Sequence, residues 1–70
     1  MTSEQTKELK DAASKFLVAL PLPNGQQSIR PAKILNLYSE NIAEMEITTE
    51  DDKTLTLYLP CTNINFITNI

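Results

Sequence analysis

The sequence predicts a mainly β fold with an N-terminal α-helix: a small antiparallel β-barrel, or a four- to five-stranded meander, with the helix packed on it. Two observations carry this prediction. Apolar residues near the N-terminus recur with helical spacing. After Ser28 they alternate with polar residues in short segments that are separated by polar turns. Short strands joined by tight turns favour an antiparallel sheet or small barrel. Seventy residues allow one domain, residues 1-70.

The first twenty residues fit an amphipathic helix. Thr2 and Gln5 fit a capping box at its start. One helical face carries six apolar residues: Leu9, Ala12, Ala13, Phe16, Leu17 and Leu20. On this interpretation the helix spans about residues 3-19, and Pro21 sets its latest end.

A second interpretation of the same segment stays open. Phe16, Val18 and Leu20 also alternate, so a helix over about residues 3-14 can be followed by a strand. Asn24-Gly25 then forms the tight turn into the next strand.

The rest of the chain, about residues 28-68, predicts a β-meander. Strands are expected over 28-38, 42-49, 54-59 and 62-68, with turns at 39-41 and 50-53. Tyr58 alternates against three leucines, so we expect its side chain to be exposed.

Composition narrows the chemistry. The chain has no His, one Cys and one Gly. These counts exclude the usual His-containing triads, imidazole metal ligands, a thiolate zinc site within one chain and a Gly-rich phosphate loop. We therefore expect no enzymatic activity and no cofactor. The longest apolar run, Phe16 to Leu20, is too short for a bilayer span, and a single cysteine fits a reducing compartment, so we expect a cytoplasmic protein without membrane contact.

Charge is distributed unevenly. Six acidic residues and no basic residue lie between Glu40 and Asp52, and alternation places Glu44 and Glu46 on the solvent side of their strand. A solvated sheet face is the simplest interpretation. The alternative is an acidic face for a basic protein partner, as in a small phage- or plasmid-type inhibitor of a host protein, formed by Glu44, Glu46, Glu50, Asp51 and Asp52.

The segment from Cys61 to Ile70 contains no charged residue. An uncharged last strand is an edge that invites pairing with another chain, unless it is paired within the monomer. Ile64, Phe66 and Ile67 are the candidate edge residues. The prediction is a non-catalytic, homo-oligomeric interaction module that acts through protein–protein contacts.

Three segments also carry a family resemblance. Residues 16-20 with Asn24-Gly25 and residues 32-35 are similar to the first two strands and turn of the Sm and Sm-like (Hfq-like) small β-barrels. Asn41-Ile42 resembles part of that family's first motif, and residues 57-67 resemble its second motif. The resemblance implies an N-terminal helix followed by five bent antiparallel strands. Pro60-Cys61 stands where the family has Arg-Gly or a Lys-His-type pair.

The resemblance implies an alternative function, an Sm-like ring that binds single-stranded RNA. Its candidate residues are Arg30, Lys33, Asn41 and Tyr58, with Tyr58 as a surface on which a base can stack. Against this alternative, phosphate binding depends on Lys and Arg, and residues 28-70 contain three basic residues against six carboxylates.

Overall fold

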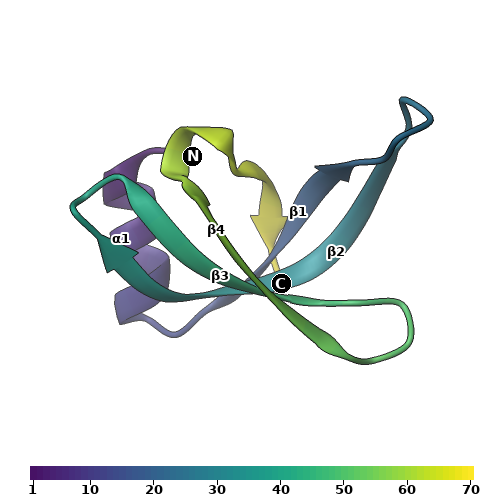
Figure 1. The fold of residues 1–70 in the computed structure, drawn as a ribbon. Helices are drawn as coiled ribbons and strands as arrows, with labels where there is room; N and C mark the ends of the chain where they lie inside the picture. The colour runs from purple at the N-terminus through teal and green to yellow at the C-terminus, as the bar shows by residue number, and fades with distance from the viewer.

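The computed structural model describes residues 1–70 and confirms the mainly β fold (Figure 1). One N-terminal helix precedes five antiparallel strands in a single open sheet, whose strand order is β4-β3-β2-β1-β5. The elements are α1 (Ser3–Asp11), β1 (Lys15–Pro21), β2 (Gln27–Tyr38), β3 (Ile42–Thr48), β4 (Thr54–Pro60), the 3-10 helix η1 (Cys61–Asn63) and β5 (Asn65–Asn69).

The helix is short. Thr2 caps its start, with the Thr2 side chain accepting a hydrogen bond of 3.1 Å from the Gln5 N–H. At its end, Ser14 N–H donates to the Leu9 carbonyl and Ala13 N–H donates to the Lys10 carbonyl, and Ala13 adopts φ 51°. This is a Schellman motif, which turns the chain out of the helix.

The expectation of a helix through about residue 19 is therefore wrong, and the helix-then-strand alternative describes this segment. β1 pairs with β2 on one side and with β5 on the other, which buries Phe16 and Val18 as alternate residues of a strand.

Three tight turns connect the first four strands. Between β1 and β2, Gly25 N–H donates to the Leu22 carbonyl, and Gly25 adopts the left-handed conformation at φ 84°. In the turn between β3 and β4, the Asp52 N–H donates to the Thr49 carbonyl in the same way, and Asp52 is also in the left-handed conformation, at φ 61°. Ser39, Glu40 and Asn41 join β2 to β3. The Asn41 N–H donates to the Tyr38 carbonyl, and Ser39 and Glu40 have positive φ.

The sheet bends strongly, and α1 packs against β2 and η1 (Figure 1). Its inner face holds the core, a cluster of Leu9, Phe16, Val18, Ala32, Ile34, Ala43, Met45, Ile47, Cys61 and Ile64. Its outer face carries the residues between the buried ones, such as Lys33, Glu44 and Tyr58. α1 has nine residues and η1 three, so neither is long enough to cross a membrane.

Candidate functional site

The sheet ends in two strands that each lack a partner on one side. β4 lies at one edge and β5 at the other, so both have main-chain N–H and C=O groups free to pair with another strand. On β4, Leu55 is 51% exposed and Tyr58 is 63% exposed. The expected exposure of Tyr58 is confirmed.

The β5 edge differs in part from the expectation. Ile67 is 47% exposed and lies on β5, as an edge residue should. Phe66 is half-buried, and its ring centroid lies 5.8 Å from that of Phe16. Ile64 precedes β5 and is only 3% exposed within the core, so its side chain is not available to a partner.

A second feature lies on the outer face, where β2, β3 and β4 run side by side (Figure 1). Three side chains donate hydrogen bonds to the Glu44 carboxylate. Asn36 Nδ2 lies 2.7 Å from Glu44 Oε1, and the Tyr38 hydroxyl lies 3.2 Å from the same oxygen. The Tyr58 hydroxyl lies 2.6 Å from Glu44 Oε2. We refer to these four residues as the tyrosine–glutamate cluster.

The strand register produces this cluster. Asn36 and Tyr58 lie directly opposite Glu44 on the two neighbouring strands, and Tyr38 lies one diagonal step away. The two tyrosine ring centroids are 6.4 Å apart, and the ring planes are tilted by 36°. The two rings therefore lie close to each other, and both hydroxyls reach the Glu44 carboxylate from the strands on either side of β3. Tyr38 is 48% exposed.

The hydrogen bonds change the acid–base properties of the cluster. The hydrogen bond from Tyr58, and then that from Asn36, lowers the pKa of Glu44, while partial removal from water opposes this change. The pKa of Tyr58 is raised, first by its hydrogen bond to Glu44 and then by partial removal from water. For Tyr38, partial removal from water comes first in raising the pKa, followed by the hydrogen bond to Glu44. Glu44 thus remains negatively charged and the phenols remain protonated at neutral pH.

Sequence reasoning named Glu44 for an acidic face and Tyr38 and Tyr58 as surfaces on which a base could stack, but it did not place either tyrosine, or Asn36, beside Glu44. Simple alternation from the buried Ala32 and Ile34 places residues 36 and 38 on the inner face. The register shift between Ile34 and Asn36 adds one residue, which turns Asn36 and Tyr38 outward. Two adjacent apolar residues, Ile34 and Leu35, are the sequence signal that a bulge was needed there.

The residues proposed for RNA binding do not form one surface. Arg30, Ala32 and Ile34 are alternate residues of β2, so Arg30 lies on the inner face of the sheet. Lys33 lies between Ala32 and Ile34 in sequence and therefore on the outer face. Arg30 Nε donates a 2.8 Å hydrogen bond to the Thr48 carbonyl at the end of β3. The two cations of β2, Arg30 and Lys33, thus lie on opposite faces of the sheet.

Asn41 lies where β2 turns into β3. Its carbonyl accepts a 2.7 Å hydrogen bond from the N–H of Cys61, which joins this turn to η1. The thiol of Cys61 is free and buried in the core. The turn at Asn41-Ile42 is therefore in direct contact with Pro60-Cys61, the pair at which the chain departs from the Sm-like pattern.

The five acidic residues divide into two groups. Glu44 and Glu46 lie on the outer face of β3. Glu50, Asp51 and Asp52 form the turn to β4, where Asp51 approaches Lys53 at 3.9 Å. No group of three or more His, Cys, Asp or Glu side chains is arranged to hold a metal ion.

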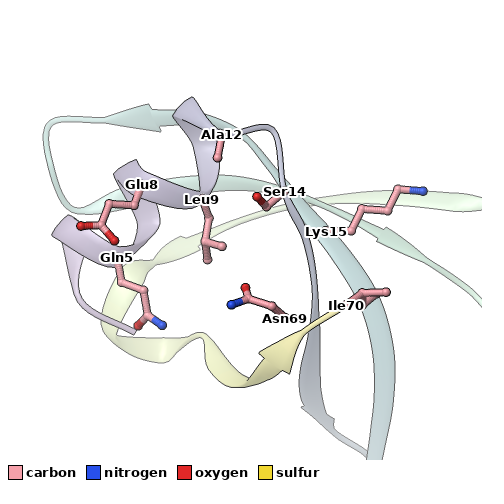
Figure 2. Close-up of a pocket in the computed structure, with 8 residues that line it drawn as sticks. All are labelled: Gln5, Glu8, Leu9, Ala12, Ser14, Lys15, Asn69 and Ile70. Atoms are coloured by element: carbon pink, nitrogen blue, oxygen red, sulfur yellow. The ribbon is translucent and has the colours of Figure 1, made fainter.

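Figure 2 shows a hollow of about 380 Å³ between α1 and the end of β5. Gln5, Glu8 and Leu9 come from the helix, and Asn69 comes from β5. Lys15 also borders the hollow, but its amino group points away from it (Figure 2). Glu8 is the one acidic side chain in the lining.

A second depression lies on the inner face, at the end of the sheet far from α1. Leu20, Leu22 and Leu55 line it together with Arg30 and Glu50. Its apolar lining continues to the exposed part of β4, so it adds to the apolar surface beside that edge.

Comparisons of this chain with family models, with curated proteins and with solved structures give no match.

Proposed function

We propose that this chain is a non-catalytic interaction module that assembles with copies of itself, the β5 edge of one copy pairing with the β4 edge of the next. The observation that carries the proposal is the open sheet, which ends in two unpaired strands with exposed apolar side chains, Leu55 on β4 and Ile67 on β5. Unpaired strand edges are templates for pairing with another chain.

The size of the core supports the same proposal. Only 12 of 70 residues are buried, and domains of this length bury a smaller share of their unfolded surface than larger domains do. Pairing of β4 with β5 between copies would bury Leu55 and Ile67 and satisfy main-chain groups at both edges. On the β5 side, this pairing would bury no charged side chain, because residues 61-70 contain none.

We extend the proposal to the architecture, an Sm-like small barrel that forms a closed ring. Support comes from the order of helix and five strands and from the contact between Asn41 and Cys61. Two different edges make a head-to-tail interface, and such interfaces give rings when the rotation between copies closes. The cytoplasmic location expected from the single cysteine is part of this proposal.

Two charged variants test the assembly. Leu55→Lys places a cation on β4, and Ile67→Lys places one on β5; lysine on an edge strand opposes strand pairing. Native mass and sedimentation measurements should give an oligomer for the wild type and a monomer for each variant. Ile29→Lys is the matched control, since Ile29 is 53% exposed on the interior strand β2.

Mixing the two variants is the sharper test. Each variant keeps one intact edge, so an equimolar mixture should give a one-to-one dimer that grows no further. A wild type that stays at the monomer mass of 7.9 kDa at high micromolar concentration contradicts the proposal. So does a mixture that contains only monomers although the wild type is oligomeric.

A further inference from the structure

The tyrosine–glutamate cluster is a surface site that self-assembly through the strand edges does not use. Its side chains project from the outer face, whereas edge pairing uses the main chain of β4 and β5. Glu44 is charged, yet its three hydrogen-bond donors are all neutral groups, and it forms no ion pair. The cluster therefore presents a negative charge that the chain itself does not neutralise.

The two aromatic rings complete the recognition chemistry. Each phenol hydroxyl donates a hydrogen bond to the Glu44 carboxylate, which increases the electron density of its ring. A cation over such a ring is attracted by the negative π face. Both hydroxyls bond to the Glu44 carboxylate, so a group that stacks on the ring of Tyr38 or Tyr58 is close to that carboxylate.

We propose that the tyrosine–glutamate cluster binds an arginine side chain from a basic segment of a partner protein. Arginine fits better than lysine because its guanidinium is planar, stacks on aromatic faces and is more weakly hydrated. The charge around the cluster is complementary to a basic segment. Glu46 lies two residues further along β3 on the same face, and Lys33 is the one cation directly opposite it.

The proposed arginine site rests on the proposed role as an interaction module, but it does not require self-assembly. Arginine binding and self-assembly can therefore be tested separately. The chain has two tyrosines and no tryptophan, and both tyrosines are in the cluster. Tyrosine absorbance, fluorescence and ring NMR signals thus report on the site. Because Tyr58 lies on the edge strand β4, the peptide is titrated at a fixed protein concentration, and sedimentation follows assembly in the same samples.

The probe is a short peptide with several arginines, compared with a lysine peptide and a citrulline peptide of the same length. The arginine peptide should shift the ring signals of Tyr38 and Tyr58, the lysine peptide should bind more weakly and the neutral citrulline peptide should leave them unchanged. Tyr58→Leu should weaken arginine-peptide binding by about two- to five-fold, the usual contribution of an exposed cation–π contact. Tyr58→Phe keeps the ring and should retain most of the binding.

Glu44→Gln should also weaken binding of the arginine peptide, and more strongly than the matched change Glu46→Gln. Circular dichroism checks that each variant keeps its β fold. Equal binding of arginine and lysine peptides that is insensitive to Tyr58→Leu overturns the proposal, because it indicates charge alone. Failure of the arginine peptide to shift the ring signals overturns it too. A uridine-rich RNA that shifts these signals at about 50 mM salt when the peptide does not would replace it with base stacking.

Discussion

At the scale of single residues, Glu44 links three strands through its carboxylate. Its lowered pKa means that its hydrogen bonds stabilise the fold above the ordinary glutamate pKa and are lost as the pH falls through the lower folded value. The hydrogen bonds of the two phenols depend on pH in the alkaline range. Their raised pKa values give stability that is fully present below the ordinary tyrosine pKa of about 10 and is lost as the pH rises through the higher folded values.

Replacing Glu44 with glutamine should therefore change how the tyrosines titrate. In the wild type we expect tyrosinate absorbance to develop above pH 10, and Glu44→Gln should move it back toward 10, because the anionic acceptor is lost. Glu46→Gln removes one charge from the same strand without touching either hydroxyl, so it should leave the titration close to that of the wild type. Identical curves for Glu44→Gln and wild type would contradict the cluster geometry.

At the scale of turns and helix ends, backbone conformation determines the cost of a substitution. Gly25 has φ 84°, and an added Cβ would meet no atom within 4 Å. The cost of Gly25→Ala is thus purely conformational. The left-handed conformation costs alanine about 1–2 kcal/mol, partly offset by the stiffer unfolded chain, so we expect a net loss of about 1 kcal/mol. Urea unfolding measures it, and Gly25→Asn should lose less because asparagine tolerates this conformation better.

The end of α1 gives a prediction of the opposite sign. Ala13 has φ 51° at the position that usually holds glycine in a Schellman motif. Ala13→Gly should therefore stabilise the protein, by about 0.5–1 kcal/mol after the greater flexibility of glycine in the unfolded chain is counted. Ala12→Gly is the matched control, because Ala12 has an ordinary helical φ of −81° and should lose stability instead. Equal effects at both positions would contradict the left-handed conformation of Ala13 after the end of α1.

The same helix end shows how far the sequence predicts this fold. Local patterns predict the three strands within residues 28-60 well, since Ala43, Met45 and Ile47 are buried as alternation requires. The expected strand over 62-68 and its place at the end of a meander are wrong, because Cys61–Asn63 form η1 and β5 (Asn65–Asn69) pairs with β1 instead of β4. Local patterns leave residues 15-20 undecided because both a helix and a strand bury Phe16. What decides is β5, more than forty residues away in sequence, which pairs with β1 and makes it an interior strand. A long-range partner of this kind leaves no local signal, whereas the bulge that brings Tyr38 to Glu44 is marked only by the adjacent apolar pair Ile34-Leu35.

At the scale of the whole molecule, the open sheet determines where further stability can come from. β1 is covered on both sides by β2 and β5, whereas β4 has only β3 as a neighbour. Adding a strand from another copy is the change that satisfies both edges at once. Stability should then depend on protein concentration, because binding that occurs only in the folded state raises the free energy of unfolding.

We therefore expect the midpoint of thermal unfolding to rise with concentration. Well above the dissociation constant, a tenfold increase in protein adds about 1.4 kcal/mol for each interface, which in a domain of this size raises the midpoint by roughly 6–11 °C. Ile67→Lys should give a lower midpoint that does not change with concentration, since its β5 edge no longer pairs. Ile29→Lys, with the same change of charge on the interior strand β2, should keep the concentration dependence of the wild type. A wild-type midpoint that is constant from micromolar to millimolar protein would mean that the edges stay unpaired and that the monomer is the stable form.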